Sequence, residues 1–163
     1  MRVHSALRTA FAGPLVISVA IGLAGCWQGN TAATYVQSTQ GATGDGVEKN
    51  SENGQVGVRG ALIVAQDGNF SVIATLVNKS AQPERLVSVA VGDIIINTDI
   101  TIPASGTAQV GHSTAKERIF GTGLLTLPSA FVPVQFQFGT HGPVTAALLV
   151  RAPEGYWKGI PVK

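Results

Sequence analysis

The stretch that decides the fold is residues 56–78, VGVRGALIVAQDGNFSVIATLVN. Residues 56–65 and 70–78 are rich in Val, Ile, Leu and Thr, and the four residues QDGN separate them. The Asp67-Gly68 pair within this separator supplies the positive φ angles that a tight hairpin turn needs. These residues therefore predict two antiparallel strands joined by a short turn.

The strand-and-turn pattern continues along the chain to residue 150. Further strands are predicted over residues 85–91, 94–102, 107–110, 124–127, 132–138 and 144–150. In the first of these, the branched residues Val87, Val89 and Val91 are expected to face the core. Within residues 132–138, Val and Phe alternate with Pro and Gln, so one face of that strand is expected to be buried and the other wet.

Taken together, about seven or eight short strands and no convincing amphipathic helix indicate an all-β fold. We predict an antiparallel sandwich of the immunoglobulin-like or cupredoxin-like kind, formed by one domain over residues 56–152. The C-terminal tail, residues 153–163, carries Tyr156 and Trp157 among Gly, Pro and Lys. The sequence leaves open whether this tail docks on the sandwich or stays loose.

The segment before the domain has a different composition. Residues 28–55 are rich in Gly, Thr, Ser, Asn and Gln, and Tyr35, Val36 and Val47 are its large apolar side chains. Such a segment buries too little apolar surface to offset the entropy lost on ordering. We interpret residues 26–55 as a flexible tether with a root-mean-square reach of roughly 30 Å. The alternative is that part of it forms an extra edge strand.

The N-terminus has the three parts of an export signal. Arg2 and Arg8 form a basic start, residues 11–23 form an apolar core, and Leu23-Ala24-Gly25-Cys26 matches the bacterial lipobox. We predict that residues 1–25 are a signal peptide and that Cys26 is the lipid attachment site. The apolar core is shorter than the roughly 20 residues of a membrane-spanning helix. An ordinary secretory signal is the alternative, although it would leave an unpaired thiol on an exported protein.

Composition excludes several partner classes. The chain has 11 Lys and Arg, of which Arg2 and Arg8 lie in the predicted signal, so the remainder balances the nine acidic residues. A neutral domain without a dense basic run argues against nucleic acid and against electrostatic docking to anionic lipid. The expected contacts are the cell membrane, through the lipid on Cys26 at the extracytoplasmic face, and an envelope protein of unknown identity.

Nothing downstream of Cys26 predicts an enzyme. The serines considered as nucleophiles are Ser105, Ser113 and Ser129, and none lies in a Gly-x-Ser-x-Gly elbow. The Gly121-Thr122-Gly123 run lacks the third glycine and the following helix of a phosphate-binding loop. Asp93 and Asp99 flank a strand, where turn and capping roles are typical. We therefore predict no catalytic residue, and an enzyme assembled from distant loops is the least supported hypothesis.

Four segments carry a family resemblance: residues 85–89 (RLVSV), 102–106 (IPASG), 134–138 (VQFQF) and 142–144 (GPV). In this order they resemble actinobacterial lipoproteins that are distantly related to the periplasmic copper chaperones of the PCuAC type. The resemblance covers residues 69–150 and implies a cupredoxin-like or immunoglobulin-like sandwich. It also implies a Cu(I) site in which a His and Met pair acts with a His-x-Met pair, because soft thioethers suit this ion.

The chain departs from that copper site, because Met1 is its single methionine and lies in the predicted signal. His112, near where the copper chaperones place their second histidine, and His141, in a predicted turn, remain as candidate ligands. Two imidazoles alone make a weak and poorly selective site, so we predict neither a metal site nor a cofactor. The leading hypothesis is a non-enzymatic, membrane-anchored envelope lipoprotein with a binding or assembly domain. The alternative is a copper or other metal-trafficking lipoprotein with a degenerate or rebuilt site.

Overall fold

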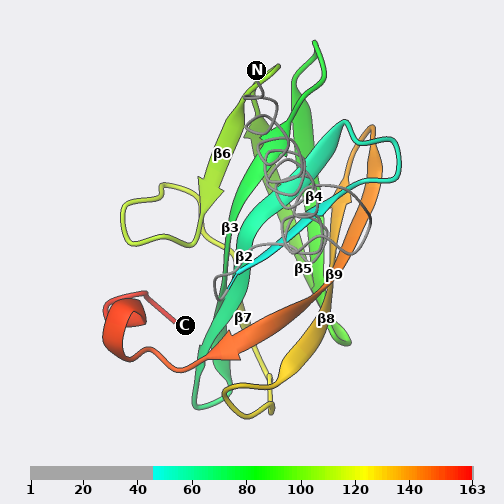
Figure 1. Cartoon of the computed structure of the whole chain (residues 1–163). Coiled ribbons are helices and arrows are strands. Elements are labelled where there is room, and N and C mark those ends of the chain that lie inside the picture. The colour runs from blue at the N-terminus through cyan, green and yellow to red at the C-terminus, as the bar shows by residue number, and fades with distance from the viewer. Residues whose placement is uncertain (1–45, 163) are drawn as a thin grey trace, which may run out of the picture. The chain divides into compact units, whose positions relative to one another are not determined.

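The computed structural model describes residues 46–162, so the predicted signal peptide, Cys26 and most of the predicted tether lie outside the described residues. The described part contains nine strands and one short 3-10 helix (Figure 1). They are β1 (Val47–Asn50), β2 (Val56–Gln66), β3 (Asn69–Asn78), β4 (Glu84–Val91), β5 (Ile94–Ile102), β6 (Thr107–Val110), β7 (Phe120–Thr122), β8 (Phe131–Phe138), β9 (Gly142–Arg151) and η1 (Gly155–Trp157). The predicted all-β class is confirmed, and residues 46–162 contain no helix with the length and hydrophobicity to cross a bilayer.

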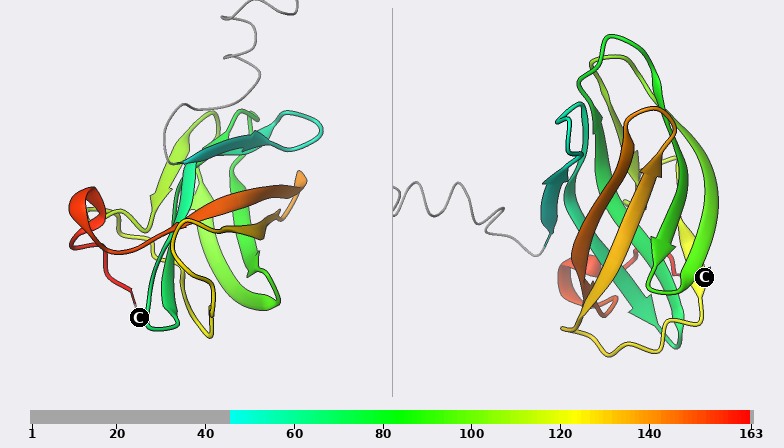
Figure 2. Two further views of the ribbon diagram at one scale, coloured as in Figure 1. Left: turned by 60° about the horizontal axis from the view of Figure 1, so that its bottom comes forward. Right: turned by 90° about the vertical axis from the view of Figure 1, so that its right-hand side faces the viewer.

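The strands form two layers that are joined along one side (Figure 2). One layer contains β1, β2, β3, β6 and β7, and the other contains β5, β4, β8 and β9. Within each layer the pairings are antiparallel, as predicted. The layers meet where β2 and β9 pair in parallel, through Ile63 opposite Val150 and Val64 opposite Arg151. The result is a nearly closed sandwich of nine strands rather than seven or eight.

The hairpin predicted over residues 56–78 is formed by β2 and β3. Asp67 and Gly68 have φ angles of 52° and 80°, as a primed hairpin turn requires. A bulge between Arg59 and Leu62 divides β2. Gly60 lies in this bulge with a φ of 58°, a conformation that glycine adopts without steric cost. The bulge lets the first half of β2 pair with β1 while the second half pairs with β9.

The main core lies between the two layers and is aliphatic and aromatic. Its largest members include Phe70, Phe136 and Phe138, which are fully buried. On β8 the predicted alternation is confirmed, because Val132, Val134, Phe136 and Phe138 are buried while Pro133 and Gln135 are exposed. The core residues all lie within the compact unit Gly41–Lys163. A chain that begins at Gly41 therefore contains everything that the core needs.

The C-terminal tail docks on the sandwich. Trp157, Ile160 and Val162 pack against Leu62, Val64 and Ile73, a second apolar cluster on the outer face of β2 and β3. Of the two alternatives left open by the sequence, docking is the one that the structure shows. It occurs because alternate side chains of β2 and β3 are apolar on both faces, so the outer face also needs a cover.

The start of the domain is earlier than predicted. Val47–Asn50 forms β1, which pairs with β2, although these residues belong to the segment interpreted as tether. Gly46 lies so close to Gly60 that a Cβ atom on it would clash with the Gly60 backbone. The predicted boundary at residue 56 is therefore wrong, and the alternative of an extra edge strand is correct for these four residues.

Two further strand predictions need correction. Residues 124–127 form no strand, because Phe120–Thr122 takes the place beside β3 and Gly123, with a φ of 91°, turns the chain away. In β4, Val89 and Val91 are buried as predicted, but Val87 is only half-buried and Leu86 is buried instead. A bulge between Leu86 and Ser88 shifts the register and exchanges the two faces at this point.

Candidate functional site

The two histidines considered as metal ligands lie in different connections between strands. His112 is half-buried in the connection from β6 to β7, and its carbonyl oxygen accepts a hydrogen bond from the N–H of Ala115 at 2.9 Å. His141 lies in the turn between β8 and β9. Within residues 46–162 there is no group of three or more His, Cys, Asp or Glu residues that could hold a metal ion.

His141 is instead bound to a buried carboxylate. Its Nδ1 lies 2.5 Å from Oε2 of Glu84, the first residue of β4, whose side chain is 2 % exposed. The Glu84 carboxylate also accepts hydrogen bonds from the backbone N–H groups of Arg85, Thr140 and His141, at 2.7, 3.1 and 3.1 Å. Burial alone raises the pKa of the Glu84 carboxyl, but the hydrogen bonds outweigh burial and hold this pKa below its usual value.

Glu84 thus fixes the β8–β9 turn against the start of β4. No pattern in the sequence indicates this role, because a glutamate at the edge of a predicted strand is ordinarily expected to be solvated. The role follows from the antiparallel β4–β8 pairing, which brings residues distant in the sequence together. The carboxylate occupies Nδ1 of His141, so at most the Nε2 atom of this ring is left as a donor. The described residues also contain no thioether, and they do not fit the Cu(I) site that the resemblance implies.

The remaining candidates from the sequence lie at separate positions in the described part of the chain. Asp99 on β5 accepts a hydrogen bond from Nε of Arg85 at 2.7 Å, and Asp93 lies exposed in the β4–β5 turn. Gly121 lies against the ring of Phe70 so closely that a Cβ atom there would clash with it, so packing explains this glycine. The three serines lie in turns and loops: Ser105 and Ser129 have positive φ angles, and Ser113 is exposed between β6 and β7.

One end of the sandwich carries an unusual set of exposed apolar side chains. The β2–β3 turn, the β4–β5 turn and the connection from β7 to β8 lie at this end (Figure 1). The connection crosses it, and the N–H groups of Gly123 and Leu124 donate to the carbonyl oxygen of Gly68 at 2.8 and 3.1 Å. Four exposed side chains define what we call the apolar end: Ile95, Leu125, Leu127 and Phe131, with exposed fractions of 71 %, 93 %, 78 % and 63 %.

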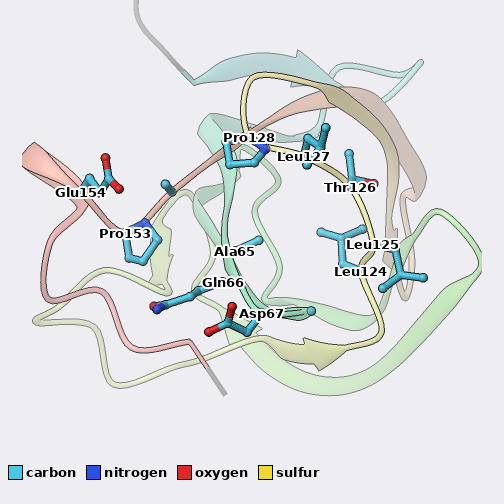
Figure 3. Close-up of a pocket in the computed structure, with 12 residues that line it drawn as sticks. Ala65, Gln66, Asp67, Leu124, Leu125, Thr126, Leu127, Pro128, Pro153 and Glu154 are labelled. Carbon is cyan, nitrogen blue, oxygen red and sulfur yellow. The ribbon is translucent and has the colours of Figure 1, made fainter.

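A groove of about 470 Å³ adjoins the apolar end (Figure 3). The connection from β7 to β8 forms one wall, the segment after β9 forms the opposite wall, and the β2–β3 turn lies between them. The lining residues are Ala65, Gln66, Asp67, Gly68, Leu124, Leu125, Thr126, Leu127, Pro128, Ala152, Pro153 and Glu154. They include no serine, cysteine or histidine, so the groove offers apolar contact and two carboxylates rather than a nucleophile and a base.

Comparison with known proteins identifies solved structures that share the fold of this chain. No protein-family model matches the sequence, and no curated protein is significantly similar to it. Among solved structures, the apo PCuAC domain of PmoF2 superposes with a TM-score of 0.55 at 16% identity, covering 66% of this chain and 97% of that domain. The chain has the PCuAC fold. The copper-bound PCuAC domain of PmoF2 gives a TM-score of 0.53 at 17% identity, covering 65% of this chain and 98% of that domain.

The apo PCuAC domain of PmoF1 agrees, with a TM-score of 0.54 at 17% identity over 65% of this chain and 99% of that domain. The distant PCuAC relationship expected from the sequence is therefore confirmed at the level of the fold. A shared fold does not identify the ligand of this chain, which has to be inferred from the residues of the chain itself. Of these residues, the apolar end and its groove were not anticipated, because residues 124–127 were expected to be covered as a strand.

Proposed function

We propose that this chain is a non-enzymatic, lipid-anchored envelope protein whose PCuAC-like domain binds a protein partner at the extracytoplasmic face of the cell membrane. The observation that carries the proposal is the apolar end, where Leu125 and Leu127 are almost fully exposed on one loop. Soluble domains seldom expose clustered large apolar side chains unless these contact a partner. The adjacent groove supports binding rather than catalysis, since its lining holds no serine, cysteine or histidine.

The proposal is tested by crosslinking in the native membrane. A photoreactive amino acid placed at Leu125 should form one discrete adduct with a protein, because this side chain would be covered in the complex. The same amino acid placed at Gln109, which is exposed on β6, provides the control and should not form that adduct. Adding Leu127→Ser should reduce the Leu125 adduct by roughly tenfold, as expected when a central apolar contact is lost. Equal adduct yields at both positions would contradict the proposal.

Anchoring through Cys26 makes a separate prediction. We expect Cys26→Ala to move the chain from the membrane fraction to the soluble fraction, because each buried lipid methylene contributes about 0.8 kcal/mol to membrane binding. The measurement is fractionation followed by immunoblotting of both fractions. Full retention of the variant in the membrane pellet would show that another feature holds the chain there.

A second candidate function, copper trafficking, is favoured by the copper-bound PCuAC domain among the structural neighbours. The residues of this chain count against it, because His141 is bound to Glu84 and no methionine lies in the described part. We therefore expect the chain to lose Cu(I) completely to a strong chromogenic chelator. Stoichiometric Cu(I) that is retained by the parent chain and lost in His112→Ala would favour trafficking instead.

A further inference from the structure

We propose that the groove beside the apolar end binds a polypeptide segment in which apolar side chains are flanked by Lys or Arg. This inference rests on the proposed function and names the chemistry of the partner. It is drawn from three properties of the groove, which are its concave shape, the leucine and proline side chains in its walls and the two carboxylates on its border.

The shape and the walls favour a chain segment as the occupant. The groove volume of about 470 Å³ lies in the range typical of ligand sites, roughly 300–1,000 Å³. Leu124 is buried beneath the loop, whereas Leu125 and Leu127 remain exposed and Pro128 continues the same wall. Pro153 lies on the opposite wall (Figure 3). An apolar side chain inserted between these walls would cover both leucines, which no described residue covers.

The acidic residues of the groove indicate which residues of the bound segment flank its inserted apolar side chains. Asp67 and Glu154 border the groove, both residues are exposed, and neither takes part in an ion pair with another residue of the range 46–162. The lining contains no lysine or arginine. A cation on each side of an inserted apolar residue would therefore meet a carboxylate, and complementary charge of this kind sets which partner is accepted.

Two other occupants fit these observations less well. In a symmetric contact with a second copy, the same surface faces itself, so the carboxylates of both copies would be brought together. A bilayer with anionic headgroups would repel Asp67 and Glu154, and a concave groove leaves its walls uncovered on a flat surface. The experiment must therefore also be able to detect binding of a second copy and binding to a bilayer.

The test uses a chain of residues 41–163, which contains the complete core, and two synthetic peptides of about 12 residues. Both peptides carry the same central leucines, flanked by lysines in one and by glutamates in the other. In an NMR titration, the lysine peptide should shift the amide signals of Gly68, Leu125 and Leu127 and reach saturation. The glutamate peptide should bind about tenfold more weakly, and high salt should remove most of this difference.

Variants separate the contributions of the walls and the charges. Leu125→Ser combined with Leu127→Ser should weaken the lysine peptide at least about tenfold. Asp67→Asn combined with Glu154→Gln should abolish the preference for lysine, and asparagine tolerates the positive φ at position 67. Two controls lie outside both the groove and the apolar end: Tyr156→Ser removes an exposed apolar side chain, and Glu52→Gln with Glu117→Gln removes the same amount of charge. Both controls should bind like the parent chain.

Four results would overturn the inference. The first two concern the peptides: no saturable shift with the lysine peptide at millimolar concentration, or equal affinity for both peptides. The third is leucine-dependent binding to phosphatidylglycerol vesicles without peptide binding, which would indicate a membrane as the occupant. The fourth is a dimer that the double serine variant abolishes, which would indicate a second copy of the chain. The outcome is distinguishable from failure of the proposed function. If the Leu125 adduct forms in membranes but the lysine peptide does not bind, the partner chemistry alone is wrong. If that adduct is absent, the proposed function itself fails.

Discussion

Replacing Glu84 with alanine should lower the free energy of unfolding by about 3–5 kcal/mol, because several groups lose a buried hydrogen-bond acceptor, at a cost of about 1–3 kcal/mol each. The carboxylate accepts hydrogen bonds from three backbone N–H groups and lies 2.5 Å from Nδ1 of His141. Alanine at this position leaves those donors without an acceptor in a place where water has little access. Urea unfolding of a chain of residues 41–163, followed by circular dichroism, measures the change.

Asp99→Asn is the matched control for Glu84, because Asp99 is also a carboxylate that accepts a hydrogen bond from a neighbouring side chain, in this case Arg85. Both side chains of that pair are exposed, so its loss should change stability by less than about 1 kcal/mol. Similar losses in the two variants would show that Glu84 does not hold the β8–β9 turn.

The same carboxylate gives the fold a defined response to acid. The pKa of Glu84 is lower in the folded chain than its ordinary value of 4.5, which applies to the unfolded chain. Its contribution to stability is therefore complete above the unfolded-state pKa and is lost as the pH falls through the lower folded-state pKa. The parent chain should lose this contribution below about pH 4, and Glu84→Ala should lack that step.

Phe70→Ala should also cost about 3–5 kcal/mol of stability, because the ring is fully buried and its removal leaves a cavity. Phe70 lies between the layers, and Gly121 of β7 packs directly on its ring. Phe131→Ala makes the same chemical change at a site that is 63 % exposed, and it should cost less than about 1 kcal/mol. Chemical denaturation of both variants provides the comparison, and equal losses would contradict the packing described for Phe70.

The sequence predicts the fold best where local pattern and burial agree. The β2–β3 hairpin was predictable because Asp67 and Gly68 supply the required φ angles between two long apolar runs. Strand β8 was predictable because strict alternation of apolar and polar residues matches the two faces of a strand. In both segments the local preference and the tertiary environment require the same conformation.

The predictions fail where a distant contact decides the outcome. β1 is mostly polar and becomes a strand because β2 offers an open edge beside Gly60. Residues 124–127 have strand composition, yet the edge of β3 is already occupied by β7. The apolar end was hidden for the same reason, since a leucine in a sequence is ordinarily expected to be buried. Glu84 was missed because its partners, Thr140 and His141, are far away in the chain.

Strand β1 also determines how the domain would respond to mechanical load. It lies between Val56, where the main core begins, and the segment that leads toward Cys26, so under the proposed anchoring a pull from the membrane reaches β1 first. Glu48, Lys49 and Asn50 are exposed, and β1 contributes only the half-buried Val47 to the core. Peeling β1 and its following turn from β2 would release about 10 residues, or roughly 30 Å of extra length. Under such a force, β1 would detach from β2 and lengthen the connection to the membrane before the rest of the sandwich unfolds.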